Sequence, residues 1–146
     1  MTAKEYLKQY DMAKKRANIL KAEYEKEMLQ IDAIRSSSDI DGMPHSTGIN
    51  KSVEDKAIRL ADKALAWKSA ELDALRLRQQ IFDLIYRLPS PESEILYERY
   101  IELCTWANVS RKVSLSWSAV RKHHNAALDM VKIKIAEKEQ QVTTIV

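Results

Sequence analysis

The chemistry that stands out in this sequence lies in one short basic stretch, residues 105–128. Lysine and arginine can donate hydrogen bonds to guanine, an asparagine amide can pair with adenine, and a serine hydroxyl can bond to either. Cations, hydroxyls and backbone amides hold phosphates instead. The stretch offers a set of residues for each task. The candidate base contacts are Ser118, Arg121, Lys122 and Asn125, and the candidate phosphate contacts are Arg111, Lys112, Ser114 and Ser116.

Two helices joined by a tight turn are predicted to position these side chains. Thr105 is a good N-cap for a helix over 105–113, and Ser116 is a good N-cap for a longer helix over 116–131. Successive residues of a helix turn by about 100°, which places Lys122 and Asn125 opposite the apolar stripe of the second helix. The spacing is that of a helix-turn-helix. The stripe consists of Val120, His124, Ala127, Leu128, Val131 and Ile135.

A third short helix is predicted just before this pair. Pro89 and Pro91 end the preceding helix, and Ser90 is the expected cap of a new helix that runs to about Leu103. Its acidic side chains are expected to form a solvated face, and the alternative is an acidic contact patch for RNA polymerase. These side chains are Glu92, Glu94, Glu98 and Glu102.

Two long amphipathic helices precede the short ones. Apolar residues recur at helical spacing over residues 3–35 and again over 51–88, where Asn50 or Ser52 is the expected cap. The connector 36–50 holds both glycines and several turn-forming residues. The simplest arrangement is an antiparallel coiled-coil hairpin. The pattern leaves open whether the hairpin closes within one chain or between two chains.

Aromatic and histidine side chains of the basic stretch have competing interpretations. Trp106 and Trp117 could stack on bases, but both fall on or near the packing face and are expected in the core or at its edge. His124 is expected to be packed and hydrogen-bonded, and His123 to lie on the surface. Neighbouring helix positions diverge, so the two histidines do not predict a metal site.

Composition predicts an all-α protein, since helix-forming residues abound and glycine and proline are scarce. The net charge is only +3, but residues 104–135 carry six Lys or Arg against one Asp. A single cysteine and the lack of an apolar leader predict a reducing, intracellular location, and no apolar run is long enough to span a membrane. No catalytic constellation, metal site or cofactor motif is present, so an enzyme is not expected.

The whole chain resembles the phage-encoded late-gene transcriptional regulators of the RinA/ArpU type, whose C-terminal part is similar to region 4 of sigma factors. The resemblance rests on MTAKEYLKQ, on SDIDGMPHSTG and most heavily on LYERYIELCTWANVSRKVSLSWSAVRKHHNAAL. It implies that 105–113 is the positioning helix and 116–131 the recognition helix of a promoter-binding factor. The chain departs from the family pattern at Glu102-Leu103, where an Asn-Gly pair is usual, at Ser114 in place of glycine, and at Asn108 in place of glutamate.

Together the residues and the resemblance predict a sequence-specific DNA-binding regulator in the cytoplasm of a bacterial host, a late-gene activator that acts at a promoter or with RNA polymerase. Double-stranded DNA is the expected partner, with RNA polymerase and a second copy of the chain as candidate protein partners. The predicted domains are 1–88, 89–138 and a frayed tail, 139–146. Two alternatives stay open: a small terminase-like packaging subunit, and a coiled-coil interaction or inhibitor module without DNA binding.

Overall fold

The computed structural model describes the backbone of residues 1–40 and 47–145, and the side chains of residues 1–33 and 52–144. The described residues form helices joined by short turns and contain no strand, which confirms the all-α prediction. Two compact units are present: a central unit, Ala13–Asp73, and a terminal unit, which combines Met1–Met12 with Ala74–Val146. The predicted boundary between residues 88 and 89 lies inside the terminal unit.

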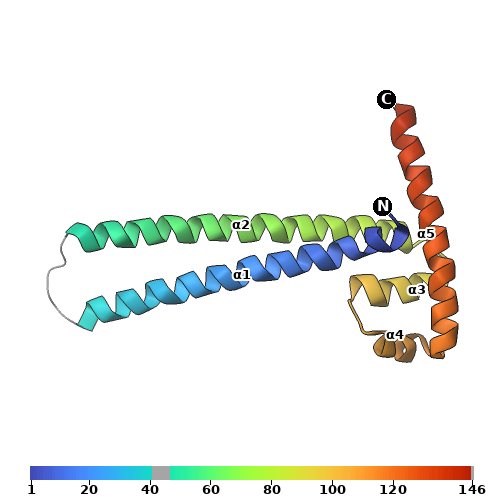
Figure 1. The fold of residues 1–146 in the computed structure, drawn as a ribbon, viewed down its shortest axis with the longest axis horizontal. Helices are drawn as coiled ribbons and strands as arrows, with labels where there is room; N and C mark the ends of the chain where they lie inside the picture. Colours follow the sequence, from blue (N-terminus) through green and yellow to red (C-terminus); the bar gives the residue numbers. More distant parts are fainter. Residues whose placement is uncertain (41–46, 146) are drawn as a thin grey trace. The chain divides into compact units, whose positions relative to one another are not determined.

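The central unit consists of parts of two long helices, α1 (Ala3–Ile40) and α2 (Thr47–Ile85), which lie side by side in opposite directions (Figure 1). Tyr24 of α1 stacks on Trp67 of α2, with ring centroids 5.4 Å apart. Glu27 interrupts the apolar stripe of α1, and its carboxylate accepts a hydrogen bond from Lys63 Nζ of α2 at 3.3 Å. The polar residue in the stripe is therefore satisfied by the neighbouring helix of the same chain.

Both long helices extend further into the predicted connector than the sequence indicates. Residues 36–40 belong to α1 and residues 47–50 belong to α2, so Asn50 and Ser52 lie inside a helix and the prediction that one of them caps it is wrong. Relative to alanine, serine, threonine and aspartate each destabilise a helix by only about 0.5 kcal/mol. A long helix that is already formed tolerates this cost. The rest of the predicted connector, residues 41–46, lies outside the described residues.

The terminal unit contains the short helices (Figure 1): α3 (Glu92–Leu96), the π-helical turn η1 (Tyr97–Ile101), α4 (Trp106–Val113) and the long α5 (Trp117–Ile145). Ile95 of α3, Val109 of α4 and Val120 of α5 are fully buried against one another. One apolar side chain from each helix thus forms the centre of the core. Partly buried residues around it are Cys104, Trp106, Val113 and Leu115.

The start of α3 differs from the prediction. α2 ends at Ile85, ahead of Leu88, and α3 begins at Glu92 with Pro91 before it and no side-chain cap. The Ser90 hydroxyl donates instead to Glu94 Oε1 at 3.1 Å. Ser90 is therefore not the N-cap, because its side chain is engaged with a carboxylate of the first turn rather than with a backbone amide.

The C-terminal residues are helical where a frayed tail is predicted. α5 continues to Ile145, and the hydroxyls of Thr143 and Thr144 donate to the carbonyls of Glu139 and Gln140 at 2.9 Å and 2.8 Å. A helix that is already nucleated adds further residues at little cost, so α5 continues although the sequence has no cap signal at its end.

Among the described residues, no helix has both the length and the apolar composition that a membrane crossing requires.

Candidate nucleic-acid interface

The starts of α4 and α5 are each stabilised by a side-chain cap that the sequence predicts. Thr105 Oγ1 accepts a hydrogen bond from the backbone N–H of Asn108 at 3.3 Å, and Ser116 Oγ accepts one from Ala119 at the same distance. Each cap satisfies a backbone amide that would otherwise have no partner at a helix start. The predicted caps Thr105 and Ser116 are confirmed.

Two non-glycine residues flank α4 in the left-handed conformation, Leu103 and Ser114, both with a φ of 57°. A residue with a Cβ atom pays about 1–2 kcal/mol for this conformation, whereas glycine adopts it freely. The backbone at Leu103 and Ser114 therefore has a geometry that glycine would adopt without this cost.

Replacing Ser114 with glycine is expected to raise the free energy of unfolding by up to about 1 kcal/mol, because relief of the strain exceeds the entropy that glycine adds to the unfolded chain. Replacing the partly buried Leu103 should raise it less, because the apolar side chain is lost as well. Urea denaturation measures the change. Ala136→Gly, at an exposed helical position of α5, is the matched control and should lower the stability by about 1 kcal/mol. A loss of stability in both left-handed variants would contradict the strain argument.

The four predicted base contacts lie on the exposed side of α5. Ser118, Arg121, Lys122 and Asn125 are all exposed, while Val120 and Val131 on the other side of the helix are fully buried. Within the described part of the chain, Arg121, Lys122 and Asn125 form no side-chain hydrogen bond or ion pair, and the Ser118 hydroxyl lies 3.3 Å from that of Ser116. We call the four residues the α5 ridge. No acidic side chain of the described residues forms an ion pair with Arg121 or Lys122.

The predicted phosphate contacts are all exposed, but one of them is already hydrogen-bonded to a carboxylate of the protein. Arg111, Ser114 and Ser116 are exposed. Lys112 is exposed too, but its Nζ donates to Glu98 Oε2 at 3.1 Å and lies 3.5 Å from Cys104 Sγ. The hydrogen bond to Glu98 raises the pKa of Lys112. A phosphate would therefore compete with Glu98 for this lysine.

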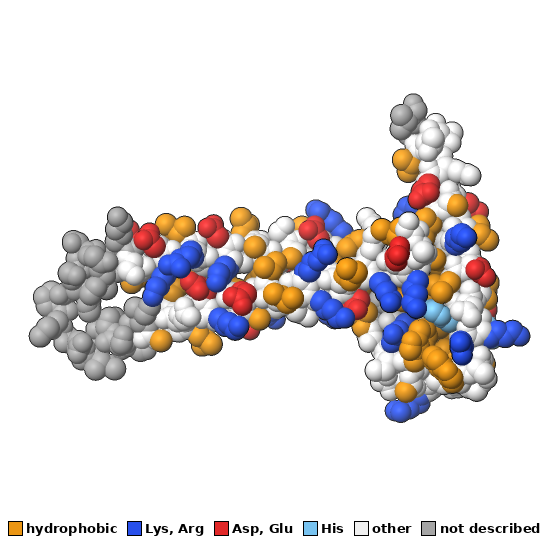
Figure 2. All heavy atoms as spheres, viewed as in Figure 1, with side chains coloured by type: hydrophobic (Ala, Val, Ile, Leu, Met, Phe, Trp, Pro, Cys, Tyr) orange, Lys and Arg blue, Asp and Glu red, His pale blue; other side chains and the backbone are white. Residues whose placement is uncertain are grey.

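An aromatic cluster supports the start of α5 from within the terminal unit. The guanidinium of Arg99 lies 4.5 Å from the ring centroid of Trp106, whose indole meets the ring of His124 edge-on at 4.7 Å. The indole of Trp117 approaches Trp106 at 5.6 Å with an interplanar angle of 66°. Figure 2 shows a hydrophobic patch over α4 and the start of α5 with Lys and Arg side chains around it. Sequence periodicity gave no indication that Arg99 joins this cluster.

His124 is packed and hydrogen-bonded, as predicted. Its side chain is 7% exposed, and its Nε2 lies 2.8 Å from the Tyr100 hydroxyl. Burial lowers the pKa of His124 to about 4, and the positive charges of Lys4 and Arg99 act in the same direction. The imidazole is therefore neutral near pH 7.

The acidic side chains before α4 form the predicted solvated face only in part: Glu94 and Glu102 are exposed, whereas Glu92 is buried and Glu98 is partly buried. Glu92 is buried, and its Oε1 lies 3.0 Å from Nδ1 of His123, which also lowers the pKa of Glu92. Glu98 bonds Lys112, and Glu102 accepts a hydrogen bond from Tyr97 at 2.8 Å. These pairs form because the short helices fold onto one another, which periodicity along one helix does not reveal.

Trp117 is the clearest difference between the predicted and the observed site. It was expected in the core or at its edge, yet its side chain is 50% exposed. The core closes at Val120, one turn later, so the first residue of α5 projects beyond it. The position of a residue relative to the end of a core depends on the neighbouring helices and cannot be read from a helical wheel.

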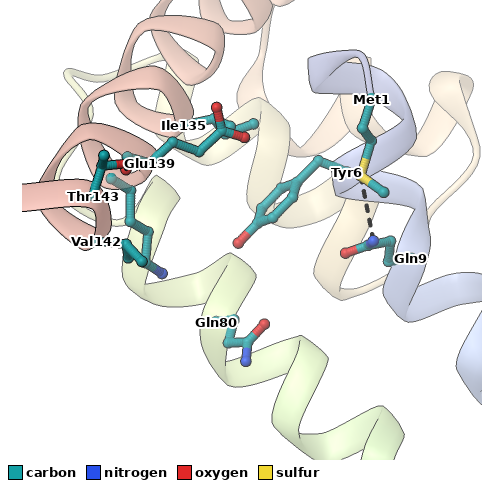
Figure 3. Close-up of a pocket in the computed structure, with 9 residues that line it drawn as sticks. Met1, Tyr6, Gln9, Gln80, Ile135, Glu139, Val142 and Thr143 are labelled. Atoms are coloured by element: carbon teal, nitrogen blue, oxygen red, sulfur yellow. Dashed lines mark hydrogen bonds between the residues drawn. The ribbon is translucent and has the colours of Figure 1, made fainter. Parts of the chain in front are cut away.

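An open pocket of about 660 Å³ lies elsewhere in the terminal unit, and its α5 residues begin at Ile135, beyond the ridge. Tyr6 points into it, while Gln9 donates to the sulfur of Met1 at 3.3 Å (Figure 3). Burial raises the pKa of Tyr6.

The described residues contain no group of three His, Cys, Asp or Glu side chains placed to hold a metal ion.

Comparisons with protein-family models, with curated proteins and with solved structures find no match to this chain.

Proposed function

We propose that the chain is a sequence-specific DNA-binding transcriptional regulator that uses α4 and α5 as a helix-turn-helix. The observation that supports this most strongly is the α5 ridge, where Arg121, Lys122 and Asn125 remain exposed and unpaired among the described side chains while the opposite side of α5 is buried. An α-helix fits the major groove of B-DNA, where base edges carry the full donor and acceptor pattern.

The proposed contacts divide into base edges and phosphates. Arg121 and Lys122 donate to guanine, Asn125 pairs with adenine, and Ser118 bonds to either base. Arg111 and the exposed Ser114 and Ser116 hold phosphates on the two sides of the turn. Lys112 joins them once a phosphate displaces Glu98.

The resemblance to phage late-gene regulators extends the proposal to the biological setting. A regulator of this kind acts at a promoter or together with RNA polymerase in the cytoplasm of a bacterial host. A single ridge of four residues makes few contacts, so RNA polymerase or a second copy of the chain would have to add to the affinity.

A genome-fragment binding selection followed by footprinting tests the proposal. The protein is expected to retain a small set of fragments, to protect one short site in each, and to lose affinity as salt rises, by roughly 0.9 log units per log unit of salt for each phosphate neutralised. Retention of no fragment at low salt, together with a stable protein partner, would favour the coiled-coil interaction module instead.

We also propose that a second copy of the chain binds the outer face of α2. Ile58, Leu65 and Leu72 are 61%, 72% and 49% exposed and recur every seven residues, the spacing of a coiled-coil seam. Apolar residues at such regular intervals on an exposed helix face favour a helical partner, and another α2 helix would present the same spacing in return.

Leu65→Glu is expected to convert a dimer to a monomer, since it places a carboxylate in the middle of that seam. Light scattering measures the mass. Ile19→Glu is the matched control, because Ile19 is similarly exposed on α1 but is not part of this seam. A wild-type monomer would contradict the proposed dimer, and a large ring would favour the small terminase-like subunit.

A further inference from the structure

Trp117 is an exposed aromatic side chain at the first position of the helix that we propose reads DNA. The indole is half exposed, because the core closes one turn later at Val120. It lies one turn before Arg121, at the N-terminal end of the helix and at the border between the buried stripe and the α5 ridge. In helix-turn-helix proteins the N-terminal residues of the second helix are the ones that contact base edges.

The indole of Trp117 packs against the indole of Trp106. Its ring approaches Trp106 at 5.6 Å in an edge-to-face arrangement. Trp106 is itself fixed between Arg99 on one side, 4.5 Å from its centroid, and His124, 4.7 Å away. A side chain supported in this way loses little conformational freedom when a ligand covers its exposed face.

Duplex DNA offers one kind of apolar group to such a surface. Bases in a duplex are stacked, so a side chain in the major groove meets their edges and not their faces. The apolar group on those edges is the C5-methyl group of thymine. We infer that Trp117 contacts a thymine methyl next to the base pair bound by Arg121, and so acts as a further specificity-determining residue. This inference rests on the proposed function.

Uracil substitution tests the contact, since uracil is thymine without the methyl group. In a selected DNA site, each thymine of the footprint is replaced in turn by uracil and the affinity is measured by fluorescence anisotropy. At one position, the replacement of thymine by uracil is expected to lower the affinity of the wild-type protein about fourfold. This is the effect of burying a single methyl group. Trp117→Ala should bind the thymine site about as weakly as the wild type binds the uracil site, and should no longer distinguish thymine from uracil there.

Two further variants make the result interpretable. Trp117→Phe keeps an apolar ring on Trp106 and should retain the preference for thymine. If it does, the loss of preference in Trp117→Ala comes from the missing ring; circular dichroism of the alanine variant checks that it is folded. Ile133→Ala removes an exposed apolar side chain of α5 that lies past the ridge, and should behave like the wild type.

The outcomes separate the inference from the function on which it rests. Absence of DNA binding by the wild type overturns both. DNA binding with equal affinity for thymine and uracil at every position, or with a preference that Trp117→Ala retains in full, overturns the thymine contact and leaves the proposed function standing.

Discussion

Simultaneous replacement of Arg121 and Lys122 by alanine is expected to weaken binding to a selected DNA site by about 100-fold, the combined effect of losing two donors to base edges. Both side chains are exposed and form no hydrogen bond or ion pair among the described residues, so their removal breaks no such interaction there. Fluorescence anisotropy at a fixed salt concentration measures the loss. Circular dichroism should show unchanged helix content.

A charge-matched variant separates base contacts from general attraction to DNA. Lys134→Ala with Lys138→Ala also removes two positive charges from α5, but from positions beyond the ridge. We expect it to reduce affinity only severalfold and equally for selected and random DNA. If the ridge variant and this control lose affinity to the same extent, α5 is not the helix that recognises the sequence.

Local features of the fold could be predicted because they depend on a few neighbouring residues. The caps at Thr105 and Ser116 need only a hydroxyl and an amide three residues later, and both are present. The buried side of α5 follows from helical periodicity, which places Val120, Ala127 and Val131 inside as expected. The exposed α5 ridge follows from the same periodicity.

Features that depend on distant residues were missed. The pairing of Lys112 with Glu98 requires η1 and α4 to fold together, and the burial of Glu92 requires α3 to lie against His123 of α5. The exposure of Trp117 depends on where the core ends. α1 and α5 are longer than predicted and α2 begins earlier than predicted, because turn-forming residues are weak helix breakers once a long helix exists.

The stability of the protein is expected to fall by about 3 kcal/mol as the pH is lowered from 6.5 to 4, because of His124. The pKa of His124 is about 4 in the folded protein, against 6.5 for a free histidine. Between these values the unfolded chain binds a proton that the folded protein excludes, so the unfolded state gains stability. Above pH 6.5 both states are neutral at this residue and its effect disappears. Urea denaturation across this range measures the slope.

His124→Gln should remove most of this slope, since the glutamine amide can still bond the Tyr100 hydroxyl but takes up no proton. His123→Gln is the control, and it should retain the slope because the buried imidazole is intact. The carboxylate of Glu92 acts separately: its pKa is lowered below the usual 4.5, so its stabilising effect is complete well above pH 4.5 and is lost only as the pH falls through about 4.5 and below. The slope between pH 6.5 and 5 therefore reports on His124. A wild-type stability that stays constant from pH 7 to pH 4.5 would show that the His124 site admits the proton, and hence that α5 is less tightly packed on Tyr100 and Trp106 than their contacts indicate.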